Sequence, residues 1–350
     1  MRLNTLMKGA AAVAVIAATT VASFSDAEAR VRMKIHSAFG KNIFVIGPGP
    51  HNVADAVKAM SNGEVDMKVF EPGALVPGTQ YFEPVSAGSI DGAWGTPGYN
   101  VNINFAYAFF SAVPFGPRGG EYLAWMRHGG GQELLDEMYA RNNIKTHICN
   151  LIAPETSGWF RNEIKSTEDL KGLKMRFFGL GAKVMEKFGV STQLLAGGDI
   201  YPALELGSID ATEFSMPAID KDYGFYQIAK HNYFPGWHQQ STLGDMIFNM
   251  DKYNELSDGQ KVIVEQACQA QVMRSFAETE AFQGQAMAFH ESKGVTNHRW
   301  SDDILAEFEK AWGEVIEAEI AGNEDAKKIW ESMSKFRATY KIWGERGYLK

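Results

Sequence analysis

The chain has 350 residues, with 34 Lys and Arg against 42 Asp and Glu, which gives a formal net charge of −8. Its 45% hydrophobic and 12% aromatic residues exclude a disordered chain, and its two cysteines exclude a disulfide scaffold. The acidic balance, with no basic run, argues against a nucleic-acid partner. The length favours two domains, because single cores stop growing near roughly 250 to 300 residues.

Residues 1–29 have the pattern of a secretory signal peptide. A short basic segment ends at Lys8, a small-residue apolar run follows over 9–24, and an Ala-x-Ala site ends at Ala29. The alternative is an uncleaved membrane anchor, which the shortness of the run and its Ala and Thr content disfavour. We therefore expect a mature protein that begins at Arg30 and is soluble in the periplasm.

Strand and helix patterns alternate after the signal peptide. Apolar residues alternate with polar ones over 31–35 and again over 65–69, whereas the apolar residues of 53–60 recur at helical spacing. This β-α-β order predicts an α/β fold with a parallel sheet covered by helices.

A short repeat divides the chain into two similar halves. Gly88–Asp91 and Gly207–Asp210 both read Gly-Ser-Ile-Asp, and each follows a short helical segment that begins near a tyrosine. The repeat predicts a helix, a glycine at its end and a buried strand leading to Trp94 in one copy and Glu213 in the other. Because ligands bind at the carboxyl ends of strands in open α/β sheets, both residues are expected to face one cleft.

The resulting domain prediction has two lobes and a helical C-terminal part. The expected boundaries are 30–150 with part of 235–260 for lobe one, 151–234 for lobe two, 257–291 for a long spine helix, and 297–350 for packing helices. Heptads are too few for a coiled coil.

The two cysteines have two interpretations. Export to an oxidising compartment allows Cys149 and Cys268 to pair. Because Cys149 lies in a strand-like run and Cys268 in the middle of the expected spine helix, the sequence favours two buried free thiols.

Arg176 is the strongest candidate for an anion-binding residue. It ends a predicted strand over 173–177, inside an apolar stretch, where a fixed guanidinium can hold a carboxylate through two parallel hydrogen bonds. The alternative is an ordinary exposed surface arginine.

Several segments together resemble one family of transport proteins. They are STEDLKGLKMR at 166–176, AGGDIYPALELGSIDATE at 196–213, FPGW at 234–237, KIW at 328–330 and FR at 336–337. The chain resembles the extracytoplasmic solute receptors of TRAP transporters, and among them the branch that binds α-keto and α-hydroxy acids together with a cation. The resemblance implies two α/β lobes joined by a hinge, a bound organic anion, and delivery to membrane permease subunits without ATP.

The resemblance also assigns roles to individual residues. Arg176 matches the arginine that binds the substrate carboxylate, and Glu155 stands where relatives commonly carry glutamine. The implied cation ligands are Glu213, the backbone carbonyl of Phe214, Glu155, and Gln239 or Gln240, with Glu155 and Gln239 also near the substrate. Position at a strand end, without a motif match, adds Trp94, Tyr99 and Asn100 as expected substrate contacts from lobe one.

Charge favours calcium over sodium in such a site. Glu155, Glu213 and a substrate carboxylate oppose the single positive charge of Arg176, which leaves two negative charges uncompensated. Sodium neutralises one and calcium both, so the sequence mildly favours a divalent ion or a protonated Glu155. All proposed ligands are oxygens, which disfavours zinc. In the alternative, Glu155 points to solvent and plays no part.

The leading hypothesis is a non-catalytic receptor for a small monocarboxylate such as pyruvate, 2-oxobutyrate or lactate. The alternatives are a receptor for a larger carboxylate, such as a dicarboxylate or sugar acid, and a sensor that presents its ligand to a membrane protein. A periplasmic enzyme is disfavoured because no positioned base, cofactor motif or Gly-x-Ser-x-Gly sequence is present. Both monomer and dimer remain open, although the short tail after Trp343 argues against exchange of a further C-terminal helix between subunits.

Overall fold

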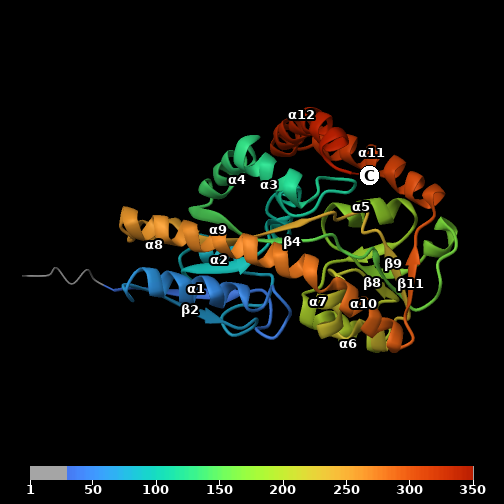
Figure 1. Ribbon diagram of the computed structural model, residues 1–350, viewed down its shortest axis with the longest axis horizontal. Coiled ribbons are helices and arrows are strands. Elements are labelled where there is room, and N and C mark those ends of the chain that lie inside the picture. The colour runs from blue at the N-terminus through green and yellow to red at the C-terminus, as the bar shows by residue number, and fades with distance from the viewer. Residues whose placement is uncertain (1–29, 350) are drawn as a thin grey trace, which may run out of the picture.

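The computed structural model describes residues 30–349, so the predicted signal peptide lies outside the described residues. Two separate sheets, each flanked by helices, form two α/β lobes that lie side by side in Figure 1. The predicted two-lobed α/β architecture is confirmed.

The sheet of lobe one has five strands. Their order is β2 (Val65–Phe70), β1 (Val31–Ser37), β3 (Gly92–Gly95), β10 (Thr242–Asn249) and β4 (Ile144–Ile152). The first three are parallel, and β10 runs antiparallel to both β3 and β4. The alternation seen in the sequence sets the register, because Val31 pairs with Val65 and Met33 with Met67 on the buried face.

The sheet of lobe two has six short strands. Their order is β11 (Thr296–Arg299), β9 (His231–Phe234), β5 (Gly158–Phe160), β8 (Ala211–Thr212), β6 (Lys174–Arg176) and β7 (Ser191–Gln193). Strand β11 belongs to this sheet, although its residues fall almost wholly in the segment expected to contain only packing helices. It pairs in parallel with β9, so the C-terminal part of the chain returns to lobe two before the last helices begin.

The repeated Gly-Ser-Ile-Asp segments have the same structure in both lobes. Gly88 and Gly207 have φ angles of +72° and +74° and end α2 (Phe82–Ser86) and α6 (Gly197–Glu205) in a left-handed turn that favours glycine. Asp91 then accepts a hydrogen bond from the backbone N–H of Lys34 at 2.7 Å, and Asp210 accepts the equivalent bond from Lys174 at 2.9 Å. Each aspartate therefore attaches the strand that follows it to its neighbour in the sheet.

The predicted spine is two helices and not one. Helix α9 (Asp258–Ala281) begins at the capping box of Ser257 and Gln260, crosses the middle of the molecule in Figure 1, and is separated by Phe282 from α10 (Gln283–Ser292). The expectation of one helix over 257–291 was wrong at this point. Phe282 is exposed, and its ring meets that of Phe44 from lobe one edge-on, at a centroid distance of 5.7 Å.

The remaining helices cover the two sheets. They are α1 (Gly49–Met60), α3 (Gly119–His128), α4 (Gly131–Ala140), α5 (Gly179–Lys187), α7 (Pro217–Tyr223), α8 (Met250–Asn254), α11 (Asp302–Ala321) and α12 (Glu324–Gly347), with short 3₁₀ helices η1 (Pro97–Asn100), η2 (Phe105–Phe110), η3 (Thr167–Leu170) and η4 (Phe225–Gln227). Helices α11 and α12 lie together along the top of both lobes in Figure 1. Among the described residues, no helix is long and apolar enough to cross a membrane.

Cys149 and Cys268 form a disulfide, so the expectation of two free thiols was wrong. Cys149 lies in β4 and Cys268 in α9, and their Cα atoms are 4.1 Å apart. Helix α9 follows β4 closely, because the Ser275 hydroxyl bonds both backbone groups of Leu151. This side-by-side packing brings together cysteines that are 119 residues apart in the sequence.

Asp245 places a carboxyl group inside the core of lobe one. The Tyr139 hydroxyl donates to its Oδ2 at 2.6 Å, while its Oδ1 has no hydrogen-bond partner among the described residues. Burial raises the pKa of Asp245 to about 7 from an ordinary value of 3.8. The folded protein therefore binds this proton more tightly than the unfolded chain does, and its stabilising effect is lost as the pH rises from 4 to 7.

We expect Asp245→Asn to remove this pH dependence. A single group contributes a slope of up to about 1.4 kcal/mol per pH unit to the free energy of unfolding. Between pH 5 and pH 8 the wild type is expected to lose more stability than the variant, measured by urea unfolding at each pH. Equal losses in both proteins would show that Asp245 is ionised throughout.

The two lobes are in contact across the cleft. The backbone N–H of Phe44 in lobe one donates to the Asp222 carboxylate of lobe two at 2.8 Å. The Lys183 ammonium of lobe two lies 5.6 Å from the centre of the Phe105 ring in lobe one. The structure therefore has the lobes closed, with the residues between them shielded from solvent.

Candidate functional site

A small cavity lies between the closed lobes. It leaves about 40 Å³ for the centre of a water-sized sphere. Its lining includes residues from both lobes: Phe39, Ile46, Thr96, Tyr99, Asn150, Glu155, Arg176, Phe178, Phe214, Ser215, Gln239, Thr242 and Leu243. The cavity therefore combines apolar walls with a few polar groups that converge on one space, which is typical of a small-molecule site.

Arg176 is buried at the end of β6 and lines this cavity, so the alternative of a surface arginine was wrong. Its Nη1 donates to the backbone oxygen of Glu213 at 2.6 Å and to Glu213 Oε2 at 3.1 Å, and its Nε donates to the carbonyl of Leu195 at 3.3 Å. The Phe214 ring centre lies 5.0 Å from the guanidinium carbon. These contacts fix the guanidinium and leave Nη2 without a hydrogen bond to any described residue.

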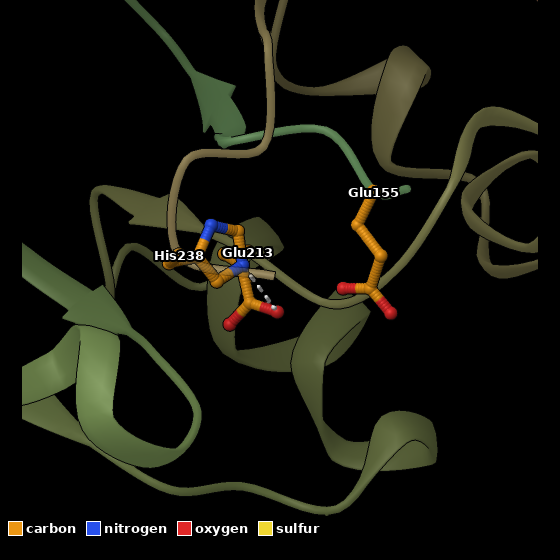
Figure 2. Close-up of side chains that lie close together, drawn as sticks. All are labelled: Glu155, Glu213 and His238. Carbon is orange, nitrogen blue, oxygen red and sulfur yellow. Dashed lines mark ion pairs between the residues drawn. The ribbon is translucent and has the colours of Figure 1, made fainter. Parts of the chain in front are cut away.

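Glu213 lies behind Arg176 and does not line the cavity. Its Oε2 also accepts the backbone N–H of Phe178 at 2.9 Å, while Oε1 lies 3.5 Å from Nε2 of His238, the contact drawn as a dashed line in Figure 2. Burial alone would raise the pKa of Glu213, but the Arg176 guanidinium, the nearby His238 ring and the backbone hydrogen bond from Phe178 hold it below its usual value. Glu213 is therefore an ionised partner of Arg176.

Glu155 lines the cavity and is buried, so the alternative of a solvent-facing side chain was wrong. Its Oε1 accepts hydrogen bonds from Gln239 Nε2 at 2.9 Å and from the hydroxyls of Ser215 and Thr242, both at 3.2 Å. Its Oε2 has no partner among the described residues. Burial, together with the negative charge of Glu213, raises the pKa of Glu155 well above its ordinary value.

Three buried oxygens near Arg176 lack hydrogen-bond partners within the described residues. They are Oε2 of Glu155, Oε1 of Glu213 and Oε1 of Gln239. Ligand atoms of Glu155, Glu213 and His238 lie within 4.8 Å of one another, and Figure 2 shows Glu155 approaching from a separate segment of the chain. Buried oxygens without partners are costly, and carboxylate and amide oxygens are the ligands that Ca²⁺ and other hard cations prefer. The residues present fit a cation site.

Of the three substrate contacts expected from lobe one, only Tyr99 lines the cavity. It lies in η1. Burial raises the pKa of Tyr99 to about 12, so its hydroxyl stays protonated at neutral pH and is available as a donor. The ring of Phe214 lies in the same lining, next to Arg176.

Three other expected contacts lie outside the cavity lining. Trp94 is turned into lobe one, where its indole N–H donates to the Ile46 carbonyl at 3.0 Å, and Asn100 donates to the Tyr139 hydroxyl at 3.1 Å. Gln240 bonds the backbone oxygen of Gly236 at 2.7 Å. A position at a strand end places a residue near the cleft, but it does not determine which way the side chain turns.

Asn150 and His238 are site residues that sequence reasoning did not assign. Asn150 lies in β4, lines the cavity, and its Oδ1 has no partner among the described residues. A polar residue inside the apolar run of 148–152 was the available signal. His238 is buried against Glu213 and directly precedes Gln239 and Gln240, the expected glutamine ligands, in the sequence.

Two α/β lobes closed over a buried arginine and a group of converging oxygens define a solute-binding protein. The family described as bacterial extracellular solute-binding protein, family 7, matches residues 41–322, and the chain belongs to this family.

Individual relatives resemble most of the chain. A monocarboxylate 2-oxoacid-binding periplasmic protein from Nostoc sp. is 31% identical over 345 residues, covering 97% of this chain and 94% of its own. A TRAP transporter solute-binding protein from Bordetella bronchiseptica is 31% identical with a TM-score of 0.88, over 90% of this chain and 94% of its own. Its structure is a dimer with copurified calcium and picolinate bound in one site and an apo site. A TRAP protein from Pseudoalteromonas atlantica with bound sodium and pyruvate is 27% identical with a TM-score of 0.85, over 90% of this chain and 96% of its own.

Proposed function

We propose that this protein is the periplasmic receptor of a TRAP transporter and that it captures a small 2-oxo or 2-hydroxy monocarboxylate together with a cation. The observation that carries the proposal is the arrangement around Arg176. A fixed guanidinium with Nη2 unengaged lies beside three buried oxygens without partners. The guanidinium is suited to a carboxylate, and the three oxygens are suited to a cation that also binds the ligand.

Charge supports calcium as the cation. Arg176 is already paired with Glu213, so a bound carboxylate and an ionised Glu155 add two negative charges to a buried site. Calcium offsets both charges, whereas sodium leaves one uncompensated or requires Glu155 to keep a proton. The relatives support both possibilities, since one contains calcium and another sodium.

The ligand bridges both lobes in this proposal. Arg176 from lobe two holds the carboxylate, while the Tyr99 hydroxyl and the Asn150 side chain of lobe one lie in the same lining. Contacts from both sides are made together only when the lobes are closed, so ligand binding favours the closed form. The closed receptor is then the form that the membrane permease recognises.

Titration calorimetry tests this function. The protein is unfolded in denaturant with a chelator, refolded without metal, and titrated with pyruvate, 2-oxobutyrate and lactate, and with succinate and gluconate for the alternative of larger acids. We expect one site per chain, occupied by the monocarboxylates when calcium is present. Tight binding of succinate or gluconate alone would favour the alternative. Recovery of the ligand chemically unchanged after long incubation distinguishes a receptor from an enzyme.

A further inference from the structure

Three aromatic rings form a continuous wall on one side of the cavity. Phe39 and Tyr99 come from lobe one and Phe178 from lobe two, and all three line the cavity. The ring centres of Phe39 and Tyr99 are 6.0 Å apart, and Phe178 meets Tyr99 edge-on at 5.5 Å and an interplanar angle of 84°. This aromatic wall is complete only when the lobes are closed, because its members belong to both.

Phe178 is held in place from several directions. Its backbone N–H donates to Glu213 Oε2 at 2.9 Å, and Gly179 follows with a φ of +62°, which turns the chain directly into α5. The tip of its ring packs over Gly98, where an added Cβ would lie 2.4 Å from Cζ. The absence of a side chain at Gly98 therefore makes room for the ring, and the surrounding contacts leave Phe178 little freedom to move aside.

The space beside the aromatic wall is small. The cavity leaves only about 40 Å³ for the centre of a water-sized sphere, so it has room for a small molecule. A carboxylate on Arg176 takes much of this space. We expect the remainder to accept a short apolar end and to leave no room for a branched chain or an aromatic ring.

We propose that Phe178, seated on Gly98, determines ligand length and restricts this receptor to 2-oxoacids of about three or four carbon atoms. The inference rests on the proposed function and narrows the range of acids that the receptor binds. Closure over a longer acid would require the Phe178 ring to occupy the position of the ligand. Such acids are therefore bound weakly by the wild type, even though they carry the same carboxylate and keto groups.

The test compares ratios of dissociation constants in Phe178→Ala and the wild type. Pyruvate, 2-oxobutyrate, 4-methyl-2-oxopentanoate and picolinate are titrated into each protein with calcium present. In the wild type we expect 4-methyl-2-oxopentanoate and picolinate, the two larger acids, to bind at least tenfold more weakly than pyruvate. In Phe178→Ala this ratio is expected to fall by about tenfold or more, since removing a buried phenyl ring opens space equal to several methylene groups.

Two controls separate specificity from general damage. Phe44→Ala removes an aromatic ring at the lobe interface outside the cavity lining, and it is expected to change all four affinities by one common factor. Gly98→Ala is expected to push the Phe178 ring into the cavity and to weaken 2-oxobutyrate more than pyruvate. Loss of stability or of lobe closure alone does not change a ratio between ligands.

The outcomes are distinct for the inference and for the proposed function. Pyruvate binding in the wild type with an unchanged ratio in Phe178→Ala would overturn the inference and leave the function intact. Wild-type binding of 4-methyl-2-oxopentanoate or picolinate as tight as that of pyruvate would also overturn it. Failure of the wild type to bind any of these acids with calcium present would refute the proposed function, and the inference with it.

Discussion

Replacement of Arg176 by lysine is expected to weaken 2-oxoacid binding by about a hundredfold or more while the protein stays folded. Lysine keeps a positive charge near Glu213, but it lacks the planar fork that pairs with Glu213 on one side and a carboxylate on the other. Losing well-aligned charge-assisted hydrogen bonds costs about 1.5 to 3 kcal/mol each, and about 2.8 kcal/mol corresponds to a hundredfold. Calorimetry gives the affinity and thermal unfolding gives the stability.

A second pair of variants separates binding from folding at this position. Arg176→Met leaves the buried Glu213 carboxylate unpaired, and breaking a buried ion pair in this way costs about 3 to 5 kcal/mol of stability. The double variant Arg176→Met with Glu213→Gln removes both charges and is expected to recover most of that stability without recovering binding. Wild-type affinity in Arg176→Lys would show that this arginine only supports the fold.

Removal of the cation is the second change with a large expected effect. Burial and the charge of Glu213 disfavour an ionised Glu155, and a bound cation offsets both contributions. We expect the wild type treated with chelator to lose 2-oxoacid binding by about a hundredfold, and calcium to restore it better than sodium. In Glu155→Gln the site carries one negative charge fewer, so sodium is expected to support binding about as well as calcium.

Gln240→Ala is the matched control for the cation experiments. Its side chain lies outside the cavity lining and bonds a backbone carbonyl, so its loss is expected to leave the preference between the two ions unchanged. The measurement is the affinity for pyruvate at fixed concentrations of CaCl₂ or NaCl. A Glu155→Gln protein that keeps the wild-type preference for calcium would contradict the charge argument.

Sequence patterns predicted the parts of the fold that are determined by residues close together in the chain. Alternation over 31–35 depends only on which strand face is buried, and the two Gly-Ser-Ile-Asp segments carry their own turn glycine and their own aspartate acceptor. The position of Arg176 at the end of a strand followed from the same kind of pattern. Its role as a carboxylate-binding residue was inferred from that position and from the family resemblance, and it stays a prediction.

Tertiary packing decided the features that the sequence did not reveal. The disulfide depends on how α9 lies along β4, which brings together two cysteines that are 119 residues apart. Trp94 points into lobe one because its indole N–H has the carbonyl of Ile46 as acceptor, a contact between segments distant in sequence. Asn150 lines the cavity because the two lobes pack against each other, which no local sequence pattern encodes.

The most direct test is a crystal structure of the protein with pyruvate and calcium at a resolution that identifies both. The account predicts the pyruvate carboxylate on Nη2 of Arg176, with calcium bound by the carboxylates of Glu155 and Glu213 and the side-chain oxygen of Gln239 and shared with the ligand. The opposite result is pyruvate bound away from Arg176, or calcium absent from these oxygens while the ligand is present. Either observation would contradict the central claim that the arginine and a cation hold the anion together.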